Sequence, residues 1–258
     1  MSDSAPAIVL AASGTSMPTA RKVFDHIDQL ARERYPQHEI RWAFTSNAII
    51  RKLRSEGIAA QCPEEVAADL RDAGFRRVAI QSLHIVPGRG FEKLKEACIP
   101  RMRVAIGKPL LASDQDMQKV IAATAECEPA LRDPQIPVVL AAHGNSRRPE
   151  FNRELIQLDA LLRAAFPATQ VATLKGQPGS DGLAEASRLA RKMGRVHFIP
   201  FMLVPGDHLM NDVMGDEPGS WKQIVGAAST TCSQSLGYRD QVLQLFFVHL
   251  DDCLSELK

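Results

Sequence analysis

Residues 8–16 read Ile8-Val9-Leu10-Ala11-Ala12-Ser13-Gly14-Thr15-Ser16, and residues 138–146 read Val138-Val139-Leu140-Ala141-Ala142-His143-Gly144-Asn145-Ser146. The shift between the two segments is 138 − 8 = 130 residues, close to half of the 258-residue chain. A repeat at this spacing is typical of two tandem copies of one unit. We therefore predict two similar α/β lobes, residues 1–128 and residues 129–258.

The two copies differ where chemistry is expected. Ser13 of the first copy is replaced by His143 in the second, and a second pair of segments, 83–88 and 201–206, sets His84 against Met202. Unlike residues at matching strand ends indicate one cleft between the lobes, with two chemically different sides.

Short apolar runs alternate with amphipathic segments, a pattern that predicts parallel sheets flanked by helices. We expect strands at residues 7–12, 39–44, 77–83, 104–106, 137–142, 169–174, 196–203 and 227–230. Apolar residues at helical spacing predict helices over 18–34, 149–165 and 239–257. The last of these is expected to pack on the body of the protein, and a crossing to the first lobe is an alternative. Residues 127–136 form the predicted linker.

Composition excludes several function classes. The net charge is +1 and aromatic residues make up 5% of the chain, so neither a general electrostatic attraction to nucleic acid nor a base-stacking platform is expected. No apolar run approaches the roughly 20 residues of a membrane span. The five cysteines show no metal-ligand spacing. No GxGxxG or GxxxxGK[ST] motif is present, so no nucleotide is expected. We predict a cytoplasmic protein.

Ligands of open α/β sheets bind outside the carboxyl ends of the strands. The residues that fall there are Ser13, His84, His143, Lys175 and His208. Taken alone, His143 could be an ordinary loop histidine, and His208 could belong to an ordinary helix start. Together, two neutral imidazoles from adjacent strand ends suit a divalent first-row metal that is held briefly and handed on. Ser13-Gly14-Thr15-Ser16 could bind a carboxylate or form only a tight turn.

The chain resembles the sirohydrochlorin cobaltochelatases of the anaerobic cobalamin pathway, which are class II tetrapyrrole chelatases. The resemblance spans essentially the whole length. It rests on several segments in order: Ser13–Ser16, Ala43–Ser46, Gln81–Gly88, Ala142–Gly144, Pro200–His208, Asn211-Asp212, Gly215–Glu217 and Ser220–Lys222.

The resemblance implies a metal site of two histidines, which match His143 and His208, and a glutamate. The glutamate belongs to a Thr-Val-Glu-Gly segment that reads Thr173-Leu174-Lys175-Gly176 here, so an ammonium replaces the carboxylate. A charged Lys175 would weaken the binding of a dication. Four interpretations stay open: an impaired site, a lysine that pairs with a substrate carboxylate, a neutral amine, and a lysine that faces solvent.

On this resemblance the protein inserts Co²⁺, as the substrate metal, into sirohydrochlorin, and His143 accepts pyrrole protons. Ser13, Gly14, Thr15 and Ser16 would anchor substrate carboxylates, and His84 would line the opposite side. A homo-oligomer is expected. Two alternatives remain: a tetrapyrrole or haem carrier or sensor with an impaired metal site, and iron or nickel insertion into the same macrocycle.

Overall fold

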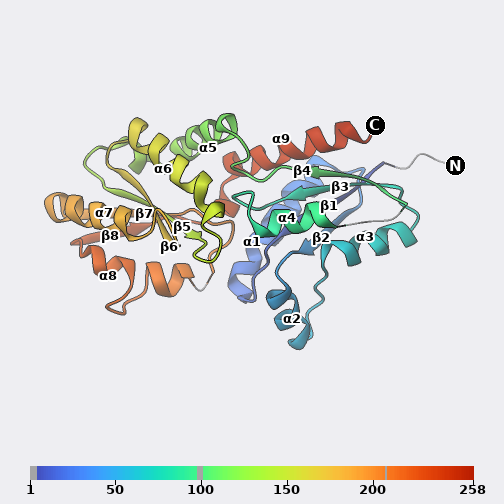
Figure 1. The fold of residues 1–258 in the computed structure, drawn as a ribbon, viewed down its shortest axis with the longest axis horizontal. Helices are drawn as coiled ribbons and strands as arrows, with labels where there is room; N and C mark the ends of the chain where they lie inside the picture. The colour runs from blue at the N-terminus through green and yellow to red at the C-terminus, as the bar shows by residue number, and fades with distance from the viewer. Residues whose placement is uncertain (1–4, 98–100, 207) are drawn as a thin grey trace. The chain divides into compact units, whose positions relative to one another are not determined.

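The computed structural model describes residues 5–97, 101–206 and 208–258, with the backbone alone at residues 180, 181 and 208. The chain divides into two compact units (Figure 1). Unit 1 comprises Met1–Ala112 and Leu243–Lys258, and unit 2 comprises Ser113–Val242. The lobe boundary that the repeat predicts, between residues 128 and 129, stays a prediction, as does the cleft.

Each unit contains one four-stranded parallel sheet. In unit 1 the order is β2-β1-β3-β4, formed by β1 (Ala7–Ala12), β2 (Ile40–Phe44), β3 (Arg77–Ser82) and β4 (Arg103–Gly107). In unit 2 the order is β6-β5-β7-β8, formed by β5 (Val138–Gly144), β6 (Thr169–Lys175), β7 (Arg195–Pro200) and β8 (Ser229–Cys232). The second order repeats the first, strand for strand. The predicted α/β class with two similar parallel sheets is therefore confirmed.

Helices cover both faces of the sheets. Unit 1 holds α1 (Pro18–Arg34), α2 (Asn47–Ser55), α3 (Pro63–Asp72), α4 (Arg89–Glu96) and most of α9 (Asp240–Glu256). Unit 2 holds α5 (Asp114–Cys127), α6 (Arg153–Ala165), α7 (Ser180–Met193), α8 (Trp221–Val225), the 3-10 turns η1 (Pro129–Arg132), η2 (Pro149–Asn152) and η4 (Leu236–Tyr238), and the π-helix η3 (His208–Val213). Because both faces are covered, the central strands read as continuous apolar runs.

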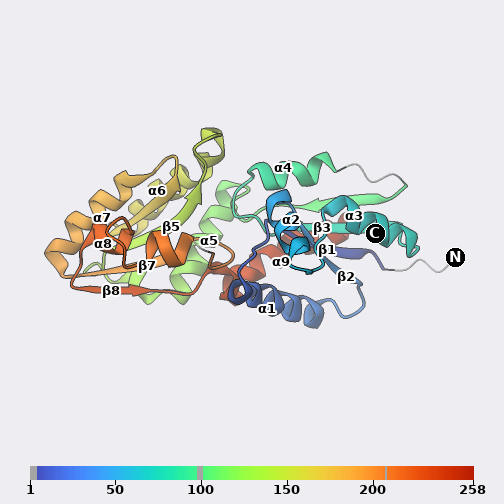
Figure 2. The same cartoon turned by 90° about the horizontal axis from the view of Figure 1, so that it is seen from below.

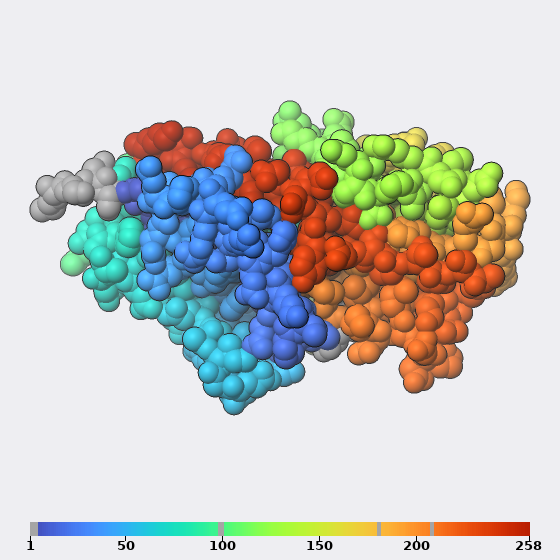
Figure 3. All heavy atoms as spheres, turned by 180° about the vertical axis from the view of Figure 1, so that it is seen from behind, coloured from blue at the N-terminus to red at the C-terminus, as the bar shows by residue number. Residues whose placement is uncertain are grey.

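The core of unit 1 lies on the two faces of β1, whose residues are all buried. Alternate residues of β1 pack with α3 and α4, and Figure 2 shows α1 and α9 on the other side of the sheet. The Tyr35 hydroxyl, just after α1, donates to Asp251 Oδ1 of α9 at 2.8 Å, and Arg34 pairs with the same carboxylate at 2.7 Å. In the space-filling view the red residues of α9 lie against the blue residues of unit 1 (Figure 3).

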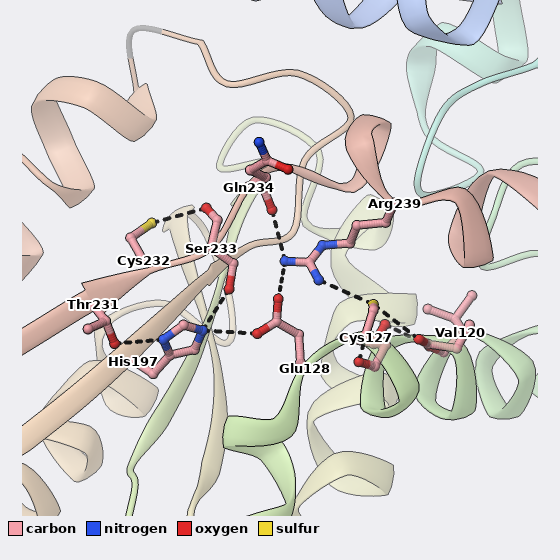
Figure 4. Close-up of polar contacts among 11 residues, drawn as sticks. Val120, Cys127, Glu128, His197, Thr231, Cys232, Ser233, Gln234 and Arg239 are labelled. Carbon is pink, nitrogen blue, oxygen red and sulfur yellow. Dashed lines mark hydrogen bonds and ion pairs between the residues drawn. The ribbon is translucent and has the colours of Figure 1, made fainter. Parts of the chain in front are cut away.

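A buried polar cluster lies at the amino-terminal half of β7 in unit 2 (Figure 4). Glu128 and Arg239, 6% and 7% exposed, form an ion pair. His197 Nε2 lies 3.1 Å from Glu128 Oε2 and 2.6 Å from Ser233 Oγ. Burial alone would raise the pKa of Glu128, but hydrogen bonds from His197 and Ser233 and the charge of Arg239 outweigh it and hold this pKa below its usual range. The cluster thereby ties the end of α5 to β7, β8 and the start of α9.

Replacing Glu128 should destabilise unit 2 strongly. Glu128→Ala leaves the buried Arg239 guanidinium without its counter-charge, which costs about 3–5 kcal/mol of unfolding free energy. Asp216→Ala is the matched control, because it removes an ion pair with Lys222 that lies at the surface and should leave stability nearly unchanged. Urea unfolding measures both variants. An equal loss of unfolding free energy in Glu128→Ala and Asp216→Ala would contradict the prediction that Arg239 depends on Glu128 for its counter-charge.

Candidate functional site

The central strand of the second sheet carries His143 at its carboxyl end. Val138–Ala142 are buried, whereas His143 is exposed. β5 pairs with β6 on one side and with β7 on the other, and Gly144 is in register with Lys175. The chain leaves β7 at Pro200 and reaches the π-helix η3 at residue 208. The predicted residues 143 and 175 therefore lie at the carboxyl ends of β5 and β6, and residue 208 follows the adjacent strand β7.

The strand register also indicates the face on which His143 lies. Successive side chains of a strand point to opposite faces of the sheet, so His143 belongs to the same face as Val139 and Ala141. Those two residues share a core cluster with Leu209 and Val213 of η3. The π-helix thus packs on the sheet face to which His143 belongs. The side chain of His208, which begins this helix, lies outside the described part of the structure.

The imidazole of His143 has a defined tautomer. Its Nδ1 atom lies 2.7 Å from the carbonyl oxygen of Gly144. A carbonyl oxygen only accepts, so Nδ1 carries the proton and, in the neutral ring, Nε2 carries the lone pair. Histidines that bind metals commonly hold their other ring nitrogen in this way. The backbone therefore leaves the lone pair of the neutral ring on Nε2.

The loops that follow β5 and β6 are packed backbone against backbone. A Cβ at Gly144 would lie 2.1 Å from the Lys175 carbonyl oxygen, and one at Gly176 would lie 2.5 Å from the Asn145 carbonyl oxygen. Both glycines have positive φ, +66° and +79°, a conformation that other residues rarely adopt. The two loops therefore approach so closely that no side chain fits at either glycine.

Two buried polar side chains complete this support. Asn152 Oδ1 accepts from the Asn145 amide at 2.8 Å, and its Nδ2 donates to the Asn145 carbonyl at 2.9 Å. Thr173 Oγ1 donates to the Gly176 carbonyl at 2.8 Å and accepts from the Gly179 amide at 2.8 Å. Asn152 and Thr173 are thus positioning residues for the ends of β5 and β6. The sequence showed no pattern that singles them out.

Lys175 is the last residue of β6 and is exposed. Its position beside Gly144 puts an ammonium-bearing residue next to the strand end that carries His143. Among the side chains that the structure describes, no three His, Cys, Asp or Glu residues are grouped as metal ligands. The metal-ligand roles predicted for His143 and His208 remain predictions.

In unit 1, the predicted anchor Ser13-Gly14-Thr15-Ser16 connects β1 to α1. Ser13 is exposed, and the buried Thr15 accepts from the Met17 amide through Oγ1 at 3.2 Å. Gly14 has φ +88°, and a Cβ there would lie 3.0 Å from both Phe44 and Ile49 side chains. The segment is therefore a tight turn against the end of β2. Its role in substrate binding stays a prediction.

His84 bridges the ends of two strands in the same sheet. Its Nδ1 atom lies 2.9 Å from Ser82 Oγ and its Nε2 atom 2.9 Å from Thr45 Oγ1. The Thr45 amide also donates to the Ala12 carbonyl at 2.9 Å, at the end of β1 between them. Burial lowers the pKa of His84 to about 4, because the charged ring would lose its hydration. Coordination of a metal or haem by His84 would require loss of one of these hydrogen bonds, and its predicted contact with substrate stays untested.

This architecture defines a class of protein when it is compared with solved structures. SirB from Bacillus subtilis with Fe³⁺ superposes with a TM-score of 0.67 at 14% identity, covering 98% of this chain and 97% of that one. CbiX, described as the terminal enzyme of sirohaem biosynthesis in denitrifying bacteria, gives a TM-score of 0.60 at 17% identity, covering 95% and 98%. At these identities the likeness shows the fold alone. The fold is that of the class II chelatases.

Sequence comparison narrows this class to a family. Residues 6–255 match the family model described as cobalt chelatase (CbiK). The sirohydrochlorin cobaltochelatase of Salmonella typhimurium is 35% identical over 229 residues, 85% of each chain. The sirohydrochlorin cobaltochelatase CbiKC of Nitratidesulfovibrio vulgaris is 32% identical over 235 residues, 87% of this chain and 81% of the relative. This chain belongs to the CbiK cobalt chelatase family. No helix in the described part of the chain is long and apolar enough to cross a membrane.

The low pKa of His84 predicts a pH dependence of stability in unit 1. The unfolded chain takes up the proton near the ordinary value of 6.5, whereas the folded chain does so only near 4. Between these values the unfolded state binds more protons, so stability falls as the pH falls. At pH 5 the loss relative to pH 7.5 is about 2 kcal/mol from this residue.

A His84→Gln variant removes this titration. Although it also changes the hydrogen bonds, the informative quantity is the slope of unfolding free energy against pH, which should be shallower between pH 7.5 and 5 than in the wild-type protein. Parallel slopes for the two proteins would show that His84 titrates normally in the folded state.

Proposed function

We propose that this protein inserts Co²⁺ into sirohydrochlorin. Membership of the cobalt chelatase family over residues 6–255 is the observation that carries the proposal. The two curated relatives bear the name sirohydrochlorin cobaltochelatase, and a structural neighbour, the sirohydrochlorin chelatase SirB, is described in complex with cobalt. The orientation of His143 at the carboxyl edge of the sheet supports the same reaction.

In this proposal His143 and His208 hold the incoming Co²⁺. Neutral imidazole nitrogen is a suitable ligand for cobalt, and two such ligands bind weakly enough to release the ion. The hydrogen bond from Nδ1 to the Gly144 carbonyl keeps the lone pair of His143 on Nε2. That geometry orients the ring before the metal arrives.

Metallation also requires a base, because two pyrrole protons must leave the ring as the metal enters. Once the metal passes to the macrocycle, the Nε2 lone pair of His143 accepts one of these protons, and the other leaves to solvent water. The Gly144 carbonyl stabilises the resulting imidazolium, since it already accepts from Nδ1. Ser13, Gly14, Thr15 and Ser16 contribute hydroxyl and amide groups to substrate carboxylates. No nucleotide takes part. A cytoplasmic location and a homo-oligomeric state belong to the same proposal.

The His143→Ala variant should lose cobalt insertion by at least about a hundredfold, since it removes both a ligand and a proton acceptor. His38→Ala is the matched control. Its Nδ1 atom also lies 2.7 Å from a carbonyl oxygen, that of Pro6, but at the amino ends of β1 and β2. The measurement is the metal-dependent spectral conversion of sirohydrochlorin. Undiminished turnover in His143→Ala would reject its role.

The lysine at position 175 favours one second candidate, a carrier that binds a tetrapyrrole or haem without metallating it. The two candidates differ in their absorbance. A chelatase should be purified without bound haem and convert sirohydrochlorin only when metal is added. A Soret band that survives purification, together with no conversion on addition of cobalt, nickel or iron, would favour the carrier.

A further inference from the structure

The outer strand of the second sheet, β8, is exposed along its edge. In the order β6-β5-β7-β8 it pairs with β7 on one side and with no other described strand. Ser229, Thr231 and Cys232 are exposed. The corresponding strand of unit 1, β4, is buried at Ala105 and Gly107. An edge strand presents a row of backbone amides and carbonyls that can pair with another strand.

The hydrogen bonds to β7 indicate which backbone groups of β8 point outward. The amides of Ser229 and Ser233 each donate to a carbonyl within residues 194–198, both at 3.0 Å. Backbone groups alternate in direction along a strand, so every second residue bonds to the same neighbour. Thr230 and Cys232 therefore direct their amides and carbonyls away from β7.

The absence of charge distinguishes β8 from the other edges. No residue from Gln223 to Tyr238 is charged, although charged residues make up 24% of the chain. By contrast, β2 carries the exposed Arg41, β4 carries the exposed Arg103, and β6 is buried along most of its length. Charged side chains on an edge oppose its pairing with a second strand, and across a twofold axis each charge would meet its own copy. At β8, two copies of the chain pair without bringing like charges together.

Side chains of β8 already hold the strand in place. Thr231 Oγ1 lies 2.8 Å from His197 Nδ1, and Ser233 Oγ lies 2.6 Å from Nε2 of the same ring (Figure 4). His197 Nε2 in turn lies 3.1 Å from the buried Glu128. The polar cluster therefore fixes β8 through residues whose backbone faces β7. A strand that is ordered before it pairs loses little conformational freedom when a partner binds.

We propose that β8 pairs with β8 of a second copy of this chain, antiparallel and about a twofold axis at Thr231. In this register Thr230 lies opposite Cys232 of the partner subunit, and the reverse pair follows by symmetry. Each pair exchanges amide-to-carbonyl hydrogen bonds in both directions, which satisfies the outward-facing groups of both residues. The two four-stranded sheets then form one continuous sheet. This inference rests on the homo-oligomeric state in the proposed function and names its interface.

The length of β8 sets the strength that we expect. The strand has four residues, whereas a stable interface usually involves about 20–30 residues on each side. The dimer should therefore be in equilibrium with the monomer. Sedimentation of the full-length protein between about 1 and 200 μM should show a dimer fraction that rises with concentration.

The Thr230→Cys variant tests the register. In a hydrogen-bonded antiparallel pair the two Cα atoms lie about 5.5 Å apart, which suits a disulfide. Oxidation with copper phenanthroline should therefore join position 230 to Cys232 of the partner subunit, giving a covalent dimer on a non-reducing gel and a 230–232 crosslink in the peptide map. The double variant Thr230→Cys, Cys232→Ser is the matched control. Its thiols at position 230 would lie diagonally, about 7–8 Å apart, and should not join.

Two further variants weaken the pair without breaking the ladder to β7. Thr230→Pro removes an outward-facing amide, and Cys232→Lys places like charges at diagonal positions across the axis. Each should raise the dimer Kd about tenfold or more. Gln29→Lys, at an exposed position of α1 in unit 1, adds the same charge elsewhere and should leave the Kd unchanged.

The outcomes separate the interface from the rest of the proposed function. A wild-type protein that stays monomeric over the whole concentration range would reject the β8 pair together with the homo-oligomeric state. Oligomers without the 230–232 crosslink, with an unchanged Kd in Thr230→Pro and Cys232→Lys, would reject β8 as the interface alone. A dimer that forms the crosslink but does not metallate sirohydrochlorin would support the β8 pair and reject the chelatase function.

Discussion

The site in unit 2 depends on the close approach of two backbone segments at the carboxyl ends of β5 and β6. Gly144 and Gly176 make this approach possible, because a Cβ at either position would lie 2.5 Å or less from a neighbouring polar atom. Asn152 then satisfies both backbone groups of Asn145, which would otherwise be costly to leave unpaired. This contact places His143 and Lys175 at the ends of adjacent strands. It also fixes the Gly144 carbonyl, which accepts a hydrogen bond from the His143 imidazole. The chemistry of this edge is therefore determined by backbone packing.

The duplicated sheets use their histidines for different purposes. In unit 1 both nitrogens of His84 are hydrogen-bonded to hydroxyls, and a low pKa keeps the ring neutral. In unit 2 the corresponding residue, Met202, packs against the core cluster. The imidazole there comes instead from His143, in the position of Ser13. The two copies thus differ at two strand ends, His84 against Met202 and Ser13 against His143. As a result, unit 1 has a buried imidazole that bridges two strands, and unit 2 has an exposed imidazole at a strand end.

Much of the fold could be predicted from the repeat and from hydrophobic periodicity. The expected strand 7–12 is Ala7–Ala12 in the structure, because a buried parallel strand is a continuous apolar run with clear ends. The strand expected at 169–174 is Thr169–Lys175. The strand expected at 196–203 is Arg195–Pro200 in the structure, although the Phe201 amide still donates to the Ala141 carbonyl at 2.8 Å. The π-helix His208–Val213 was not predicted, because a single π turn leaves no distinct periodicity. The cluster of Glu128, His197 and Arg239 was also missed, because its members are far apart in sequence and look like surface residues until the fold brings them together.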